Sequence, residues 1–149
     1  MKLLNFDLAS PNNTVELRAV GLNWDLHNFA DFEGIRVAPD GSVALTWSAP
    51  DTPNPWGDTG NHFGGCELRF RGVRRLSVTG REPSMPASED RTLAGISQVA
   101  DLMSKNRDQR EAIDTQFSLL LKFQSGVVID VDAAEAEFVP IDRGQPISH

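Results

Sequence analysis

Apolar and polar residues alternate along residues 117–131, whose sequence is FSLLLKFQSGVVIDV. Successive side chains of a strand point to opposite faces of a sheet, so the apolar positions of this segment fall on one face. These positions are Phe117, Leu119, Leu121, Phe123, Val127, Ile129 and Val131. The link Ser125-Gly126 between the two runs is typical of a β-hairpin, because glycine adopts positive φ without steric cost. The segment therefore predicts two antiparallel strands with one buried face.

The first half of the chain repeats this alternation. Three segments carry apolar side chains at every second position: residues 2–8, 14–20 and 22–26. Two further runs, residues 35–37 and 43–47, flank the turn sequence Pro39-Asp40-Gly41. A turn of this composition between two alternating runs predicts a second hairpin.

Residues 66–80 predict either a pair of strands or one bent strand. Leu68 and Phe70 share a parity with Leu76 and Val78, and Gly72 interrupts the alternation between them. A glycine at such a break indicates a β-bulge or a turn. The preceding residues 49–65 are rich in proline and glycine and have no periodicity, which predicts a long loop.

One α-helix is predicted over residues 88–103. Ser88 is a favourable N-cap, and the negative charges of Glu89 and Asp90 suit the positive end of a helix dipole. Apolar residues then recur at helical spacing, which predicts one buried stripe. They are Leu93, Ile96, Val99 or Ala100, and Met103. The polar residues 105–116 that follow predict a frayed extension or a loop.

These elements predict a mainly β fold of the α+β class. We expect an antiparallel β-sandwich or curled sheet with one α-helix packed on it. A length of 149 residues fits a single domain over residues 1–149, of which residues 140–149 are expected to form a loose tail. The order of the strands stays open, because alternation identifies strands and not their neighbours.

Charge and composition indicate which partners and which cellular location to expect. The net charge of −7 disfavours nucleic acid and anionic membranes as partners. No apolar run approaches the roughly 20 residues that a membrane helix needs, and MKLLNFDLAS lacks the apolar core of a secretory signal. Cys66 is the single cysteine, which excludes an internal disulfide and fits a reducing compartment. We therefore expect a cytoplasmic protein that binds neither nucleic acid nor a membrane.

The sharpest candidate for chemistry is the set Asp58, His62, Cys66 and Glu67. Imidazole, thiolate and carboxylate groups bind zinc, and a catalytic zinc site needs three such ligands from the protein. Spacing by four residues aligns ligands only in a helix, however, and the glycines of this segment oppose a helix. We therefore expect no cofactor, and zinc is the one alternative. The alternative to a zinc site is a surface loop with an incidental histidine and a buried cysteine.

Cys66 is also a candidate nucleophile if a histidine serves as its base. His62 and His27 are the interior histidines that qualify, although no spacing pattern supports either pair. The chain lacks the phosphate loops and nucleophile motifs of the common enzyme classes, and it has no tyrosine. A small metal-dependent or thiol–histidine enzyme that uses residues 56–67 therefore stands as an alternative function.

Two charged rows are candidate contact surfaces. Arg69 and Arg71 fall on the predicted solvent face of their strand, where they either grip an anion or pair with acids of neighbouring strands. The second row follows the last hairpin strand on the side opposite its apolar face, and consists of Asp130, Asp132, Glu135 and Glu137. It lacks the tight glycine turn of a calcium loop, which favours a solvated face or a contact for a basic partner.

Trp56, in the long loop, either folds back over the core or anchors a partner. Trp24 and Trp47 lie on apolar strand faces, so we expect them in the core. The lack of a catalytic constellation, the acidic second half and this loop together favour a non-enzymatic, acidic binding protein. Its partner would be another protein or a second copy of the chain. A small-ligand carrier with a pocket inside the curled sheet is the remaining alternative.

Overall fold

The computed structural model describes residues 1–49, 63–100 and 116–142 of the chain. These ranges contain a short 3₁₀-helix, η1 (Ala87–Arg91), and ten strands. The strands are β1 (Lys2–Leu3), β2 (Phe6–Leu8), β3 (Glu16–Ala19), β4 (Leu22–Asp25), β5 (Asp31–Val37), β6 (Val43–Ser48), β7 (Phe63–Thr79), β8 (Leu93–Ala100), β9 (Phe117–Phe123) and β10 (Val128–Asp142).

The strands form two sheets. The larger sheet has seven strands in the order β5-β6-β7-β10-β9-β8, with β1 paired to β10 beside this path. β1 runs parallel to β10, and the other pairs of this sheet are antiparallel. The smaller sheet is the antiparallel meander β2-β3-β4.

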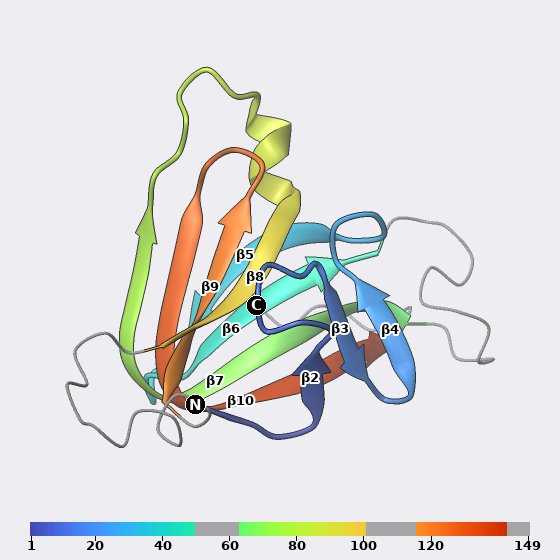
Figure 1. Ribbon diagram of the computed structural model, residues 1–149, viewed down its shortest axis with the longest axis vertical. Helices are drawn as coiled ribbons and strands as arrows, with labels where there is room; N and C mark the ends of the chain where they lie inside the picture. The colour runs from blue at the N-terminus through green and yellow to red at the C-terminus, as the bar shows by residue number, and fades with distance from the viewer. Residues whose placement is uncertain (50–62, 101–115, 143–149) are drawn as a thin grey trace.

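β7 and β10 form the spine of the larger sheet. They pair along almost their full length, from Phe63 with Asp142 to Thr79 with Val128. β6 and β5 extend the sheet from residues 65–70 of β7, whereas β9 and β8 extend it from residues 128–131 of β10. The two extensions lie at opposite ends of the spine, and the strands twist strongly between them (Figure 1).

The twist curls the larger sheet so that strands from its two extensions meet. The ring of Phe32 on β5 lies 4.8 Å from that of Phe123 at the end of β9, and 5.1 Å from that of Trp47 on β6. Arg91 of η1 adds an ion pair to Glu33 of β5 with an N–O distance of 2.6 Å. The result is a half-barrel whose concave, inner face is apolar.

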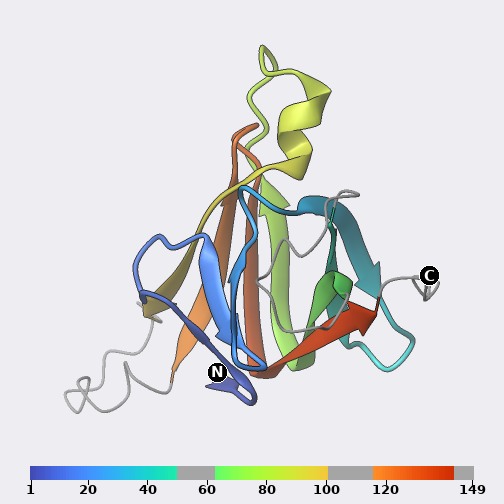
Figure 2. The ribbon, with the colours of Figure 1, turned by 90° about the vertical axis from the view of Figure 1, so that its right-hand side faces the viewer.

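The smaller sheet covers part of this inner face, and Figure 2 shows it in front of the long strands. Trp24 of β4 packs edge-on against Phe138 of β10, with ring centroids 4.7 Å apart. The indole N–H of Trp24 donates to the carbonyl of Ala19 at 3.0 Å, so this buried polar group is satisfied. The two sheets therefore enclose one core.

Hydrogen bonds tie the N-terminal segments to the larger sheet. The side-chain amide of Asn5 donates to the carbonyl of Phe138 and accepts from its N–H, each at 2.7 Å. Thr14 and Ile96 form an isolated antiparallel bridge at the outer edge of β8. These bonds fix how the smaller sheet sits on the larger one.

The alternation of apolar residues predicted the main hairpins correctly. β9 pairs with β10 across Ser125-Gly126, and β5 pairs with β6 across the Asp40-Gly41 turn. The apolar positions of β9 and of the start of β10 are buried, apart from half-buried Val127. Trp24 and Trp47 are fully buried, as predicted. A mainly β, antiparallel curled sheet is thereby confirmed.

The α-helix predicted over residues 88–103 is wrong. Residues 93–100 form strand β8 instead, and only Ala87–Arg91 form a 3₁₀-helix. Ser88 does not cap it, because the helix starts after Pro86 without a side-chain cap, and extended Thr92 ends it. Met103 and residues 105–115 lie outside the described part of the chain.

Residues 66–79 belong to one bent strand, which settles the choice left open by the sequence. The register between β7 and β10 shifts at Asp132/Ala133, opposite the segment from Val73 to Arg75. Gly72 stands just before this bulge with a φ of 64°. At the other end of β10, residues 140–142, which the sequence assigned to the tail, continue the strand.

Candidate functional site

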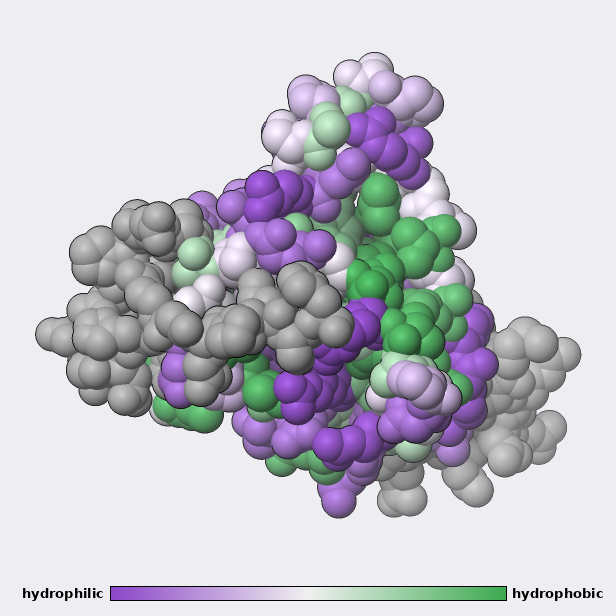
Figure 3. All heavy atoms as spheres, turned by 180° about the vertical axis from the view of Figure 1, so that it is seen from behind, coloured by the Kyte–Doolittle hydropathy of each residue, from purple (hydrophilic) through white to green (hydrophobic). Residues whose placement is uncertain are grey.

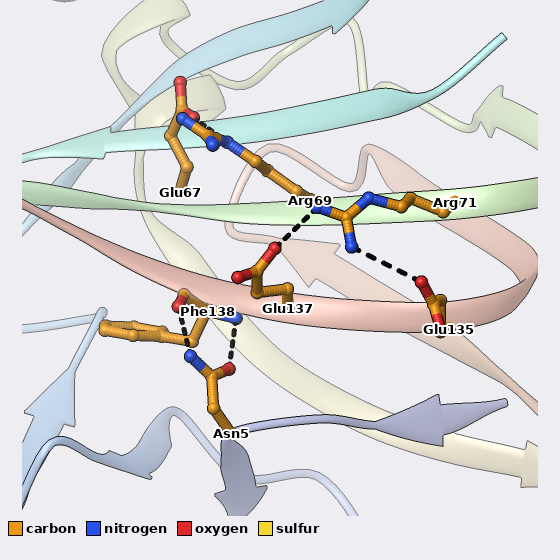
Figure 4. Close-up of polar contacts among 7 residues, drawn as sticks. All are labelled: Asn5, Glu67, Arg69, Arg71, Glu135, Glu137 and Phe138. Atoms are coloured by element: carbon orange, nitrogen blue, oxygen red, sulfur yellow. Dashed lines mark hydrogen bonds and ion pairs between the residues drawn. The ribbon is translucent and has the colours of Figure 1, made fainter. Parts of the chain in front are cut away.

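The two charged rows predicted from the sequence lie side by side on the outer face of the spine. Arg71 of β7 binds two carboxylates of β10, with N–O distances of 3.4 Å to Glu135 and 2.9 Å to Glu137 (Figure 4). Glu135 is its direct cross-strand neighbour, and Glu137 is the diagonal one. One guanidinium thus neutralises two members of the acidic row.

The same pattern continues beyond the bulge. Arg74 donates to Asp132 at 2.8 Å, and Arg75 donates to Asp130 at 3.0 Å. The hydrogen bond from Arg74 lowers the pKa of Asp132 from its ordinary value, with the positive charges of Arg74 and Arg75 adding to the effect. The arginines of β7 and the acids of β10 therefore form a ladder of ion pairs, which we call the arginine–acid ladder.

Glu67 lies at the end of this ladder and is almost completely buried, with 2% of its surface exposed. It accepts hydrogen bonds from Arg69 Nε at 2.8 Å and from Thr46 Oγ1 at 3.2 Å. Arg36 of β5 approaches it at 3.5 Å. A buried carboxylate needs such partners because losing water is costly for a charge. Glu67 is thus held by two guanidinium groups and joins β5, β6 and β7.

Cys66 points the opposite way from Glu67, because neighbouring residues of a strand face opposite sides of the sheet. Its side chain is fully buried in the core. Burial raises the pKa of the Cys66 thiol, and the nearby charge of Glu67 adds to this effect. A neutral, enclosed thiol is a poor nucleophile and a poor metal ligand. The structure therefore does not bring these two predicted ligands together.

Trp56, Asp58 and His62 lie outside the described residues, so the zinc and thiol–histidine readings of residues 56–67 stay predictions. His27 is the other histidine that the sequence offered as a base. Its Nδ1 atom lies 2.7 Å from the carbonyl oxygen of Leu93. Within the described ranges, no three His, Cys, Asp or Glu side chains come together as a metal-binding group.

A different feature of β7 is its second edge. β6 pairs with this edge only as far as Phe70. Among the described strands, none pairs with the same edge of residues 71–79. In Figure 1 this half of β7 is the outermost strand on the left-hand side of the sheet. We call this edge of residues 71–79, which no described strand pairs with, the free β7 edge.

The free β7 edge carries apolar side chains on the inner side of the sheet. Leu76 and Val78 lie opposite Val131 and Ile129, which are buried in the core. Leu76 itself is half-buried, and Val78 is 51% exposed. The apolar inner face thus continues to the edge of the sheet, where Leu76 packs against the core and Val78 stays half exposed. Figure 3 shows hydrophobic surface gathered along one flank of the rear face, below the lobe of residues 80–91.

Sequence reasoning missed this edge, and no local signal identifies it. Leu76 and Val78 have the same parity as Leu68 and Phe70, which are fully buried. The difference arises only because β6 ends its pairing at Phe70, which depends on the length and register of another strand. A second exposed apolar pair, Ile35 and Val37, lies on β5, which is the terminal strand of the larger sheet.

No helix in the described part of the chain has the length and hydrophobicity that crossing a membrane requires. Comparisons with models of protein families, with curated proteins and with solved structures found no match of any of the three kinds.

Proposed function

We propose that the chain is a non-enzymatic binding protein that contacts another protein through the free β7 edge. The observation that carries this proposal is the exposure of Val78, and in part of Leu76, on an apolar inner face beside unpaired strand backbone. Exposed apolar surface next to an open sheet edge is a common site of protein association.

The acidic row is a weaker contact surface than its sequence suggested. Its carboxylates bind Arg71, Arg74 and Arg75 within the chain. The carboxylates are only 25–34% exposed, whereas the arginine side chains that bind them are 53–59% exposed, so a basic partner would have to move these guanidinium groups aside to reach the acids. Among the described strands, none would have to be displaced from the free β7 edge before a partner strand pairs with it.

A cytoplasmic location is part of the same proposal. The single cysteine is buried and unpaired, which suits a reducing compartment. The net charge of −7 supports solubility at high protein concentration.

Selection from a library of short random peptides tests the proposed function. Peptides retained by the wild-type protein are re-tested against Val78→Arg, which places a charge on the exposed apolar side of β7. We expect the retained peptides to lose binding to this variant. Val37→Arg is the matched control, because Val37 is a similarly exposed valine on the other edge strand. Retained peptides that bind Val78→Arg and wild type equally would contradict the proposal, as would a failure to retain any peptide.

A further inference from the structure

The free β7 edge also indicates what kind of segment it binds, an inference that rests on the proposed function. We propose that it accepts an added β-strand in which apolar residues alternate with acidic ones. Three properties of the edge define this partner: its backbone, its inner side chains and the order of charges on its outer face.

The backbone of residues 75–79 is regular and long enough for strand addition. These residues pair in unbroken register with Val128–Asp132 of β10 on one side. The bulge that disturbs β7 lies before them, at Arg74. Five residues match the usual length of a strand, so an added segment gains a full set of ladder hydrogen bonds.

The inner side of the edge selects apolar side chains. An added strand would place every second residue beside Leu76 and Val78, in line with the buried Val131 and Ile129 of β10. Apolar side chains at these positions would extend the core by one strand and cover the exposed half of Val78. Polar side chains there would lose their own water against Leu76 and Val78 without gaining a hydrogen bond, which costs free energy.

The outer side of the edge selects acidic side chains. Within residues 75–79 the one charged side chain is that of Arg75, which binds Asp130 of β10, and Arg71 and Arg74 lie on β7 just before this stretch. The side chains of these arginines remain more than half exposed. A strand added next to β7 lies about 4.8 Å from the arginine row and about twice as far from the acid row. It therefore meets positive charge first, and acids on its outer side would continue the alternation of signs across the sheet.

The same charge order disfavours a second copy of the chain as the occupant. Antiparallel addition of β7 to another β7 would place the two arginine rows next to each other. Like charges on adjacent strands are destabilising. A partner with carboxylates on its outer side has no such repulsion.

The test compares two acetylated synthetic peptides, one alternating valine with glutamate and the other valine with lysine. Binding to the full chain is measured by fluorescence anisotropy at low and at high salt. We expect the glutamate peptide to bind at least about ten-fold more tightly at low salt, with the preference shrinking as salt rises. We also expect its binding to slow amide hydrogen exchange in residues 75–79, and N-methylation of alternate peptide amides on one edge to abolish binding.

A charge-swapped variant makes the test independent of the peptides chosen. Arg75→Glu combined with Asp130→Arg keeps an ion pair in the ladder and reverses the sign of the one charged side chain within residues 75–79. We expect this variant to favour the lysine peptide. If it folds poorly, as judged by circular dichroism, the single variant Arg75→Gln replaces it, and the preference for glutamate should then weaken.

The outcomes separate this inference from the proposed function. Equal binding of both peptides, or exchange protection outside residues 75–79, overturns the inference even if library peptides still depend on Val78. Dimerisation of the chain that Val78→Arg abolishes also overturns it, in favour of a second copy as occupant. A loss of all Val78-dependent binding in the library experiment overturns the proposed function itself.

Discussion

At the scale of single residues, Gly72 sets the course of β7. Its φ of 64° is a conformation that L-residues rarely adopt, and a Cβ there would lie 2.8 Å from the Cβ of Ala134. We expect Gly72→Ala to lower the free energy of unfolding by about 1–3 kcal/mol, measured by urea denaturation. Gly41→Ala is the control, because Gly41 has a φ of 85° and open space around its Cβ position. Equal losses in both variants would mean that the contact with Ala134 adds nothing.

The ion pair of Asp132 in the arginine–acid ladder should make the free energy of unfolding depend on pH. Its folded-state pKa is lowered, chiefly by the hydrogen bond from Arg74. Its stabilising contribution is therefore complete above the unfolded pKa of about 3.9, and it is lost as pH falls through the lower folded pKa.

We therefore expect Asp132→Asn to lower stability at neutral pH and to reduce the loss of stability between about pH 5 and pH 2. The free energy of unfolding is measured against pH for the wild type and the variant. Glu33, whose pKa is also lowered, contributes to both curves, so only their difference is informative. Arg74→Gln should reduce the same part of the slope. Parallel curves for wild type and Asp132→Asn would show that the ion pair does not contribute.

At the scale of elements, the alternation of side chains predicted strands well where the register is regular. Residues 117–131 form the predicted hairpin because each buried residue stands two positions from the next. The prediction failed at β8 because a bulge changes its parity. The register with β9 shifts between Leu93 and Gly95, so that Leu93 and Ile96 both reach the core although they are three residues apart. Spacing of three imitates a helix, and the sequence alone does not distinguish the two.

The candidate site was predictable in its parts and not in its arrangement. The sequence places Arg71 and Glu137 on the solvent sides of their strands, which is where they lie. Their pairing depends on the register of two strands that are far apart in the sequence and on the bulge between them. The free β7 edge has the same origin, because it is defined by where β6 stops pairing. Ion-pair partners and unpaired edges that depend on the register of distant strands cannot be read from the local alternation of residues.

We expect the curl of the larger sheet to depend more on an aromatic contact than on an ion pair. Phe32 touches both Trp47 and Phe123, whereas the ion pair between Arg91 and Glu33 is partly open to water. We expect Phe32→Leu to lower the free energy of unfolding by about 1–3 kcal/mol, and Arg91→Gln by less than about 1 kcal/mol. Urea denaturation measures both. An Arg91→Gln variant as unstable as Phe32→Leu would assign the closure to the ion pair instead.

At the scale of the whole molecule, the two sheets share one core. Trp24 of the smaller sheet packs on Phe138 of the larger one, and Phe6 adds a second contact with the same ring at 6.4 Å. The smaller sheet has three short strands, which would be marginally stable in isolation. Its stability must then come from the larger sheet, so neither sheet is expected to persist after the other has unfolded.

This coupling predicts a single cooperative unfolding transition, and the tryptophans allow each sheet to be observed separately. The variant Trp24→Phe/Trp56→Phe keeps Trp47 in the larger sheet as its only tryptophan, and Trp47→Phe/Trp56→Phe keeps Trp24 in the smaller one. In each variant, tryptophan fluorescence and far-ultraviolet circular dichroism should give the same urea midpoint, because a two-state chain shows coincident transitions by all probes. A fluorescence midpoint below the circular dichroism midpoint in the variant that keeps Trp24, but not in the one that keeps Trp47, would show that the smaller sheet detaches first. The contact between Trp24 and Phe138 would then be too weak to make the two sheets one folding unit.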